Sequence, residues 1–142
     1  MDIEHTKEAI KKEEGFRMET YHCTEGHLTG GYGHKMLEGE EAPKDHAGWL
    51  KLFERDFAKA VSGADEVLKE CPADISETAR NLVVEMVYQM GQFGVSKFKG
   101  MLKALSEKDY KQASVEMLDS RWARQVKGRA TKLANAMHNG EF

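Results

Sequence analysis

Side chains able to do chemistry gather in one stretch of this sequence, residues 13–34 (EEGFRMETYHCTEGHLTGGYGH). The stretch combines carboxylates, imidazoles, a thiol and a hydroxyl with several glycines. Polar residues that gather on loops beside a rigid scaffold are typical of functional sites. The candidates are Glu14, His22, Cys23, Glu25, His27, Thr29 and His34. We therefore expect the site here, and these residue types allow more than one chemistry.

Acid catalysis is one interpretation of this stretch. Glu14 precedes Gly15, which is placed to end a helix, and a predicted hairpin follows directly. A carboxyl group held there and partly shielded from water can act as a general acid. A solvated glutamate at a helix end has the same local sequence, so the residues alone leave both interpretations open.

A metal or phosphate site is the other interpretation. His22, Cys23, His27 and His34 are all competent zinc ligands, but adjacent residues such as His22 and Cys23 point to opposite faces of a strand. Their spacing is also not that of a common zinc motif. The Gly30–Gly33 run lacks the following helix and the lysine of a phosphate-binding loop, so tight turns explain these glycines better. We therefore expect no metal and no cofactor.

The elements that must hold these residues are a short helix and a small β region. Residues 3–14 read as a helix, because Ile3 and Ile10 are two turns apart and a glycine follows. Residues 16–34 alternate short apolar runs with glycine-containing turns, which favours a hairpin. An acidic loop at residues 38–43 separates this region from the rest.

Helices account for everything after Asp45, which is expected to cap the first of them. Ser76 opens a second apolar stripe, which Gly91 should terminate. A Ser106–Asp109 pattern predicts a capping box. Shorter helices are expected near residues 95–105, 107–118 and 129–138.

This order of elements predicts one α+β, mostly α, domain. It would contain a small lobe of about residues 15–45 and a linking helix of about residues 46–66. A helical lobe of about residues 67–142 would pack with the helix at residues 3–14.

The overall composition is that of an ordinary globular protein. The chain has 142 residues, 40% hydrophobic and 32% charged, with a formal net charge of −3. This balance argues against nucleic-acid binding driven by overall charge. Residues 97–142 carry ten basic and five acidic side chains, so a basic lobe facing an anionic surface is an alternative to solvated helix faces. There is no signal-peptide pattern, no apolar run of membrane-spanning length, and no cysteine framework.

The spacing of Glu14, Cys23 and Thr29 resembles the active-site segment of phage-type lysozymes (endolysins, glycoside hydrolase family 24). In that family a glutamate is followed after eight residues by Asp or Cys, after five more by Thr, and then by Gly-x-Gly-His, here residues 31–34. Further family motifs are matched at 87–91 (VYQMG), at Gly94-Val95 with Phe98, and at 120–122 (SRW). The resemblance covers nearly the whole chain. It implies a lysozyme-like fold with a cleft between the lobes, and hydrolysis of the β-1,4 bond between N-acetylmuramic acid and N-acetylglucosamine in peptidoglycan.

The resemblance also implies a role for each matched residue. Glu14 would be the general acid, Cys23 would occupy the position of the second catalytic group, and Thr29 would hold the attacking water. The residues implied to bind the glycan are Tyr88, Gln89, Lys35 and Glu116. The implied supporting pairs are Arg129 with Glu14, His34 with Asp56, and Glu25 with Arg121.

The sequence departs from the family pattern at three places. Cys23 stands where aspartate is commoner, Gly30 where an aliphatic residue is common, and the connection from His34 to Asp45 is shorter than in the longest members. A thiol is mostly uncharged at neutral pH. Cys23 would therefore stabilise positive charge less than a carboxylate, or act as a thiolate nucleophile with a changed stereochemical course. Gly30 would hold the neighbouring Thr29 less rigidly.

The resemblance implies peptidoglycan glycan strands as substrate, a holin-type membrane-permeabilising partner, no nucleic acid and a monomeric protein. We expect it in the cytoplasm of the host cell before its release to the periplasm or cell wall. A lytic transglycosylase acting on the same bond, and a non-catalytic peptidoglycan-binding module, are the alternative functions.

Overall fold

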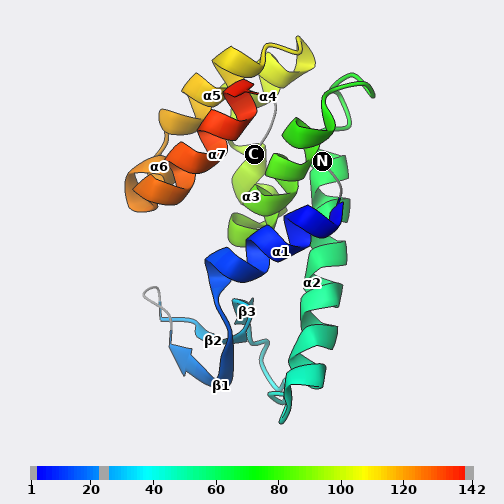
Figure 1. The fold of residues 1–142 in the computed structure, drawn as a ribbon, viewed down its shortest axis with the longest axis vertical. Helices are drawn as coiled ribbons and strands as arrows, with labels where there is room; N and C mark the ends of the chain where they lie inside the picture. The colour runs from blue at the N-terminus through cyan, green and yellow to red at the C-terminus, as the bar shows by residue number, and fades with distance from the viewer. Residues whose placement is uncertain (1–2, 23–25, 140–142) are drawn as a thin grey trace. The chain divides into compact units, whose positions relative to one another are not determined.

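The computed structural model describes residues 3–22 and 26–139, and its fold is mostly helical with one small sheet (Figure 1). In chain order the elements are α1 (Ile3–Glu14), β1 (Arg17–His22), β2 (Leu28–Gly31), β3 (His34–Lys35), α2 (His46–Val67), α3 (Glu77–Ser96), α4 (Lys99–Ser106), α5 (Tyr110–Leu118), α6 (Arg121–Gln125) and α7 (Lys127–Asn139). The predicted α+β, mostly α, fold class is confirmed.

The contacts within the chain divide it into two compact units. The first unit comprises residues 4–59, and the second comprises residues 60–139 with Ile3. The sequence interpretation placed the helix at residues 3–14 with the helical lobe, whereas residues 4–14 group with the sheet. Within this unit α1 contacts α2 through an ion pair, in which Lys7 Nζ lies 2.9 Å from Glu54 Oε2. Whether both units form one domain, with the predicted lobe boundaries, stays a prediction.

The β region is a three-stranded antiparallel sheet in the order β1-β2-β3. The prediction was a hairpin, and the structure adds a third, two-residue strand that pairs His34 with Gly30. The pairing of β1 with β2 is irregular between Arg17 and Tyr21. The small sheet therefore extends the predicted hairpin and does not replace it.

Local capping signals place two helix starts correctly. Asp45 Oδ1 accepts a hydrogen bond from the Gly48 N–H at 2.8 Å at the start of α2, and Ser76 Oγ accepts one from Ala79 at 3.1 Å at the start of α3. Gly91 interrupts α3 with φ +83° and ψ 160°, but helical structure resumes and runs to Ser96. Gly91 therefore ends the first of two helical segments, as predicted, and a second segment follows it to Ser96.

The predicted capping box at Ser106 and Asp109 is wrong. Ser106 Oγ donates to the Lys103 carbonyl at 2.6 Å, within the preceding helix. Asp109 is itself the N-cap of α5 and accepts a hydrogen bond from the Gln112 N–H at 3.0 Å. A serine can bond back to its own helix as readily as it caps the next one, so the pattern was ambiguous.

Two further helix boundaries differ from the prediction. The helix expected near residues 95–105 begins at Lys99, because α3 continues to Ser96. The prediction also missed α6, which Ser120 begins by accepting a hydrogen bond from the Ala123 N–H at 3.1 Å.

The core of the second unit contains methionines, as the apolar stripes predicted. Its fully buried side chains include Leu82, Met86, Met101, Leu105, Met117 and Met137.

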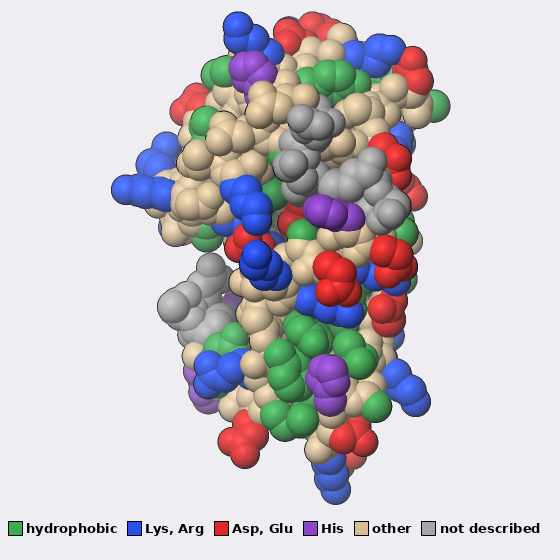
Figure 2. All heavy atoms as spheres, viewed as in Figure 1, with side chains coloured by type: hydrophobic (Ala, Val, Ile, Leu, Met, Phe, Trp, Pro, Cys, Tyr) green, Lys and Arg blue, Asp and Glu red, His purple; other side chains and the backbone are tan. Residues whose placement is uncertain are grey.

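Acidic and basic side chains are interspersed over the face of the molecule shown in Figure 2. None of the helices within residues 3–22 and 26–139 combines the length and apolar character that crossing a membrane requires.

Candidate active site

Glu14 is the last residue of α1, and its side chain is half-buried. Gly15 ends the helix with φ +69°, and its N–H donates to the Lys11 carbonyl at 2.9 Å. The carboxyl group lies against the backbone of Gly33, where a Cβ atom would come within 2.5 Å of Glu14 Oε2. Gly33 also has φ +75°, so both the contact and the backbone favour glycine here. The Glu14 carboxyl is therefore enclosed on one side by the turn between β2 and β3.

Thr29 lies on β2, the central strand, and is only 4% exposed. Its backbone is paired with Tyr21 on β1 and with Lys35 on β3. The hydroxyl group donates a hydrogen bond to the His27 carbonyl at 3.0 Å. Because a hydroxyl has one donor and two acceptor positions, its oxygen can still accept from a water molecule. The structure thus places Thr29 in the same unit as Glu14, on the strand that leads into the turn against it.

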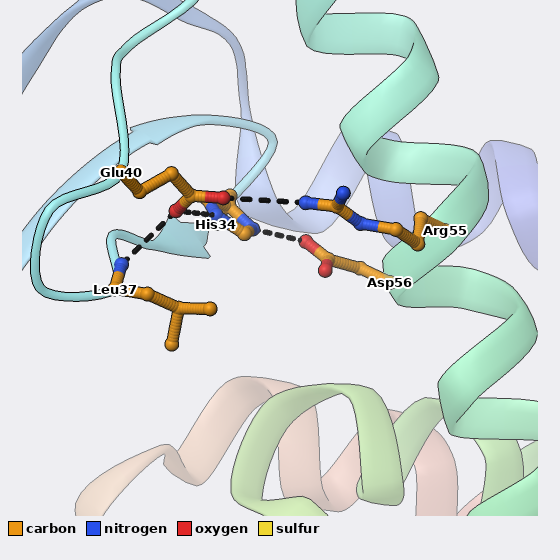
Figure 3. Close-up of polar contacts among 5 residues, drawn as sticks. All are labelled: His34, Leu37, Glu40, Arg55 and Asp56. Atoms are coloured by element: carbon orange, nitrogen blue, oxygen red, sulfur yellow. Dashed lines mark hydrogen bonds and ion pairs between the residues drawn. The ribbon is translucent and has the colours of Figure 1, made fainter.

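His34 is held between two carboxylates (Figure 3). Its Nδ1 lies 2.6 Å from Asp56 Oδ2, and its Nε2 lies 2.7 Å from Glu40 Oε1. The hydrogen bond to Asp56 raises the pKa of His34 above its ordinary value, burial opposes this, and the bond to Glu40 adds to the rise. Both ring nitrogens are donors only in the imidazolium. The contact with Asp56 that the resemblance implied is present, and Glu40 is a second partner.

Glu40 joins this cluster to the loop after β3 and to α2. Its Oε1 accepts the Leu37 N–H at 3.0 Å, and its Oε2 lies 3.2 Å from an Arg55 nitrogen. Burial acts to raise the pKa of Glu40, but the Leu37 hydrogen bond and the charges of His34 and Arg55 leave it below its ordinary value. The sequence analysis missed Glu40 and Arg55, since an acidic loop and one arginine among many give no local signal of pairing.

Tyr88 and Gln89 lie half-buried on α3, in the second unit. The Trp122 indole N–H donates to Gln89 Oε1 at 3.0 Å. An indole nitrogen is a donor only, so this bond fixes the amide orientation. The Gln89 NH₂ group consequently lies on the side of the amide opposite to this bond.

Glu116 and Arg121 line one hollow of about 300 Å³ in the second unit. Glu116 accepts a hydrogen bond from Gln112 Nε2 at 3.1 Å, and its carboxyl group lies against the backbone of Gly100. Other residues lining the hollow are Lys97, Phe98, Lys99 and Trp122. The hollow thus brings together Glu116, which the resemblance implied to bind the glycan, and Arg121, which it implied to be a supporting residue.

The remaining predicted residues are dispersed or lie outside the described residues. Lys35 is exposed on β3 in the first unit, and Arg129 is half-buried on α7 in the second. Cys23 and Glu25 fall outside the residues that the structure describes. The pairings of Arg129 with Glu14 and of Glu25 with Arg121 therefore stay predictions.

One candidate ligand of the zinc alternative, His34, is already bonded to other side chains. Both nitrogens of His34 are engaged by carboxylates. Among the described residues, no group of three or more His, Cys, Asp or Glu side chains is arranged to hold a metal ion. Cys23, the sulfur ligand of that alternative, lies outside the described ranges.

Comparison with known proteins identifies the family to which these features correspond. The sequence profile of the family described as phage lysozyme matches residues 11–137. The chain belongs to the phage lysozyme family. This match includes Glu14, Thr29, the His34 cluster and the hollow at Glu116.

Relatives of this lysozyme come from an amoeba and from a phage. The chain is 28% identical over 163 aligned positions to "Probable T4-type lysozyme 2" of Dictyostelium discoideum, which covers 97% of this chain and 96% of that protein. It is 26% identical over 161 positions to "Pre-baseplate central spike protein Gp5" of Enterobacteria phage T4, covering 95% of this chain and 28% of that protein. The protein is accordingly a glycoside hydrolase of the lysozyme type, acting on peptidoglycan.

Proposed function

We propose that this lysozyme is a muramidase, which hydrolyses the β-1,4 bond between N-acetylmuramic acid and N-acetylglucosamine, and that Glu14 is its general acid. The observation that supports this proposal most is the Glu14 carboxyl group at the end of α1, set against Gly33. The strand leading into that turn carries Thr29, with its hydroxyl proton directed to His27. Hydrolysis of a glycosidic bond needs an acid for the leaving oxygen and a second group that acts on the opposite face of the sugar; Glu14 supplies the first, and Thr29 would hold the attacking water.

In this reaction Glu14 protonates the glycosidic oxygen as the bond to the sugar breaks. The Thr29 oxygen accepts a hydrogen bond from the attacking water and so directs it to the sugar carbon. Cys23 stands at the position of the second catalytic group. With a neutral thiol the water attacks directly, inverts the configuration and gives up its proton to solvent. A thiolate nucleophile instead displaces the leaving group that Glu14 protonates and forms a covalent glycosyl–sulfur intermediate; the Glu14 carboxylate then takes a proton from the water that hydrolyses it, and the configuration is retained.

Glycan binding is assigned to both units in this proposal. The Gln89 amide, oriented by Trp122, donates to the glycan, and Tyr88 contributes an aromatic surface beside it. Lys35 and Glu116 contribute charged contacts. The supporting residues are Arg129, His34, Asp56, Glu25 and Arg121.

The test compares two neighbouring glutamates on the same helix end. Purified protein should release reducing ends from peptidoglycan, and Glu14→Gln should lower the rate by about 100-fold or more, the usual contribution of a general acid. Glu13→Gln is the matched control, because Glu13 is exposed and adjacent, and it should retain activity. Full activity in Glu14→Gln would exclude Glu14 as the acid.

Mass spectrometry of the released fragments distinguishes the remaining alternatives. Hydrolysis adds one water molecule to each cleaved bond, whereas a lytic transglycosylase leaves an anhydro-sugar. A non-catalytic binding module would sediment with peptidoglycan and release nothing.

We propose that the protein acts as a monomer in host-cell lysis and waits in the cytoplasm until a holin-type partner permeabilises the membrane. Lysis of cells that express the protein only when such a partner is co-expressed would support this role.

A further inference from the structure

Trp49 occupies the space beside two glycines of the central strand. Gly30 and Gly31 are buried, and a Cβ atom on Gly31 would lie 2.5 Å from Cε3 of the Trp49 indole. A Cβ atom on Gly30 would lie 2.8 Å from its Cζ2. The indole is 1% exposed. A side chain from α2 therefore fills the volume that these two strand residues leave empty.

The same indole also holds the neighbouring strand. Its N–H donates to the Met18 carbonyl of β1 at 2.9 Å. In the register of the two strands Arg17 pairs with Gly31 and Tyr21 with Thr29, so residues 18–20 lie opposite a single residue. The indole thus bonds to β1 in the interval where the strand pairing is interrupted.

These contacts reach both proposed reacting groups within the first unit. Gly30 directly follows Thr29, and Gly31 leads into the turn whose Gly33 lies against the Glu14 carboxyl. The expectation that Gly30 would hold Thr29 less rigidly took no account of Trp49, whose ring supplies the missing bulk. The segment from Thr29 to Gly33 is consequently fixed by strand pairing, by the indole and by the Glu14 contact.

We propose that Trp49 is a positioning residue for the reaction: its indole sets where Thr29 and the turn at Gly33 stand relative to the Glu14 carboxyl. Trp49 itself does not touch the substrate. This proposal rests on the proposed function, in which Glu14 and Thr29 carry the chemistry. A misplacement of about 1 Å at a catalytic centre can cost about 100-fold in rate. Loss of the Trp49 contacts should therefore lower the reaction rate measurably.

The test is Trp49→Phe, which keeps an aromatic ring but removes the N–H donor and part of the ring bulk. Phe57→Leu is the control, because Phe57 is also buried on α2 in the same unit but stacks on Phe53 and lies under Lys7. Both variants are assayed at a temperature where circular dichroism shows each fully folded. We expect Trp49→Phe to lower kcat about tenfold to 100-fold with KM unchanged, and Phe57→Leu to leave kcat near the wild-type value.

An unchanged kcat in Trp49→Phe, or an equal loss in both variants, would overturn the proposal. Amide hydrogen exchange provides a readout that does not depend on activity. Relative to the change in global stability, protection at Tyr21 and Thr29 should fall in Trp49→Phe and not in Phe57→Leu. If the wild-type protein releases no reducing ends from peptidoglycan, the proposed function fails. Undiminished protection of these two amides in Trp49→Phe would separately refute the positioning role of Trp49.

Discussion

The contact between Gly33 and the Glu14 carboxyl allows a sharp test, because the chain contains a matched control glycine. Gly33 has φ +75° and Gly39 has φ +78°, so alanine meets a similarly unfavourable positive φ at both positions. That conformation costs about 1–2 kcal/mol for a residue with a Cβ atom. Nothing lies within 4 Å of a Cβ atom built on Gly39. Any difference between Gly33→Ala and Gly39→Ala therefore reports the contact with the carboxyl group.

The size of the effect follows from the geometry. A Cβ atom on Gly33 would lie 2.5 Å from Glu14 Oε2, whereas real Cβ contacts essentially never fall under 3.0 Å. The carboxyl group or the turn must therefore move by about half an ångström, the limit within which catalytic groups must be held. We expect Gly33→Ala to lower kcat about tenfold to 100-fold. Gly39→Ala should lose a similar amount of stability and keep its kcat.

The assay is the release of reducing ends from peptidoglycan, combined with urea unfolding of each variant. Measurements are made where both variants are fully folded, so that stability does not enter the rate. Equal kcat values for the two variants would show that the position of the Glu14 carboxyl does not limit the reaction. The assignment of Glu14 as the acid would then lose its structural support.

Two further predictions concern the His34 cluster and the cysteines. Because the pKa of His34 is raised, its stabilising contribution is fully present below its ordinary value of about 6.5 and is lost as the pH rises through the raised value. Glu40→Gln should therefore cost about 1 kcal/mol of unfolding free energy near pH 6 and less near pH 9, as measured by urea unfolding; an equal cost at both pH values would contradict the role of the imidazolium. In the lysis assay Cys23→Asp should retain activity and Cys23→Ala should weaken it, with thiol alkylation inhibiting the wild type and sparing the Asp variant. Burial raises the pKa of Cys71 and so slows its alkylation, and equal inhibition of both forms would show that Cys23 is not the target.

Features set by neighbouring residues could be predicted from the sequence. Asp45 and Ser76 cap the helices they were expected to cap, since the accepting oxygen and the donating N–H are three residues apart. Ser106 shows the limit of such patterns, because its hydroxyl had a competing acceptor in its own helix.

Contacts between distant residues could not be predicted in this way. Trp49 and Met18 are 31 positions apart in the sequence. In the sequence alone, a glycine such as Gly30 indicates a tight turn as well as it indicates space for a distant side chain. Glu40 is one of several acidic residues in its loop, and only the folded loop directs it to His34. The family resemblance supplied the pair His34 and Asp56, but not this second carboxylate.

The small sheet has a consequence for the order in which the chain acquires structure. Its three strands are short, and hairpins of this size are marginal in water without a partner to pack against. Here the partner side chains, Trp49 and Asp56, come from α2, which follows the sheet in the chain. During synthesis, the strand carrying Thr29 therefore has no stable structure until the first half of α2 has left the ribosome. A nascent chain that stops before Trp49 lacks both partner side chains, and it would hold the proposed acid and the proposed water-binding residue without a fixed geometry between them.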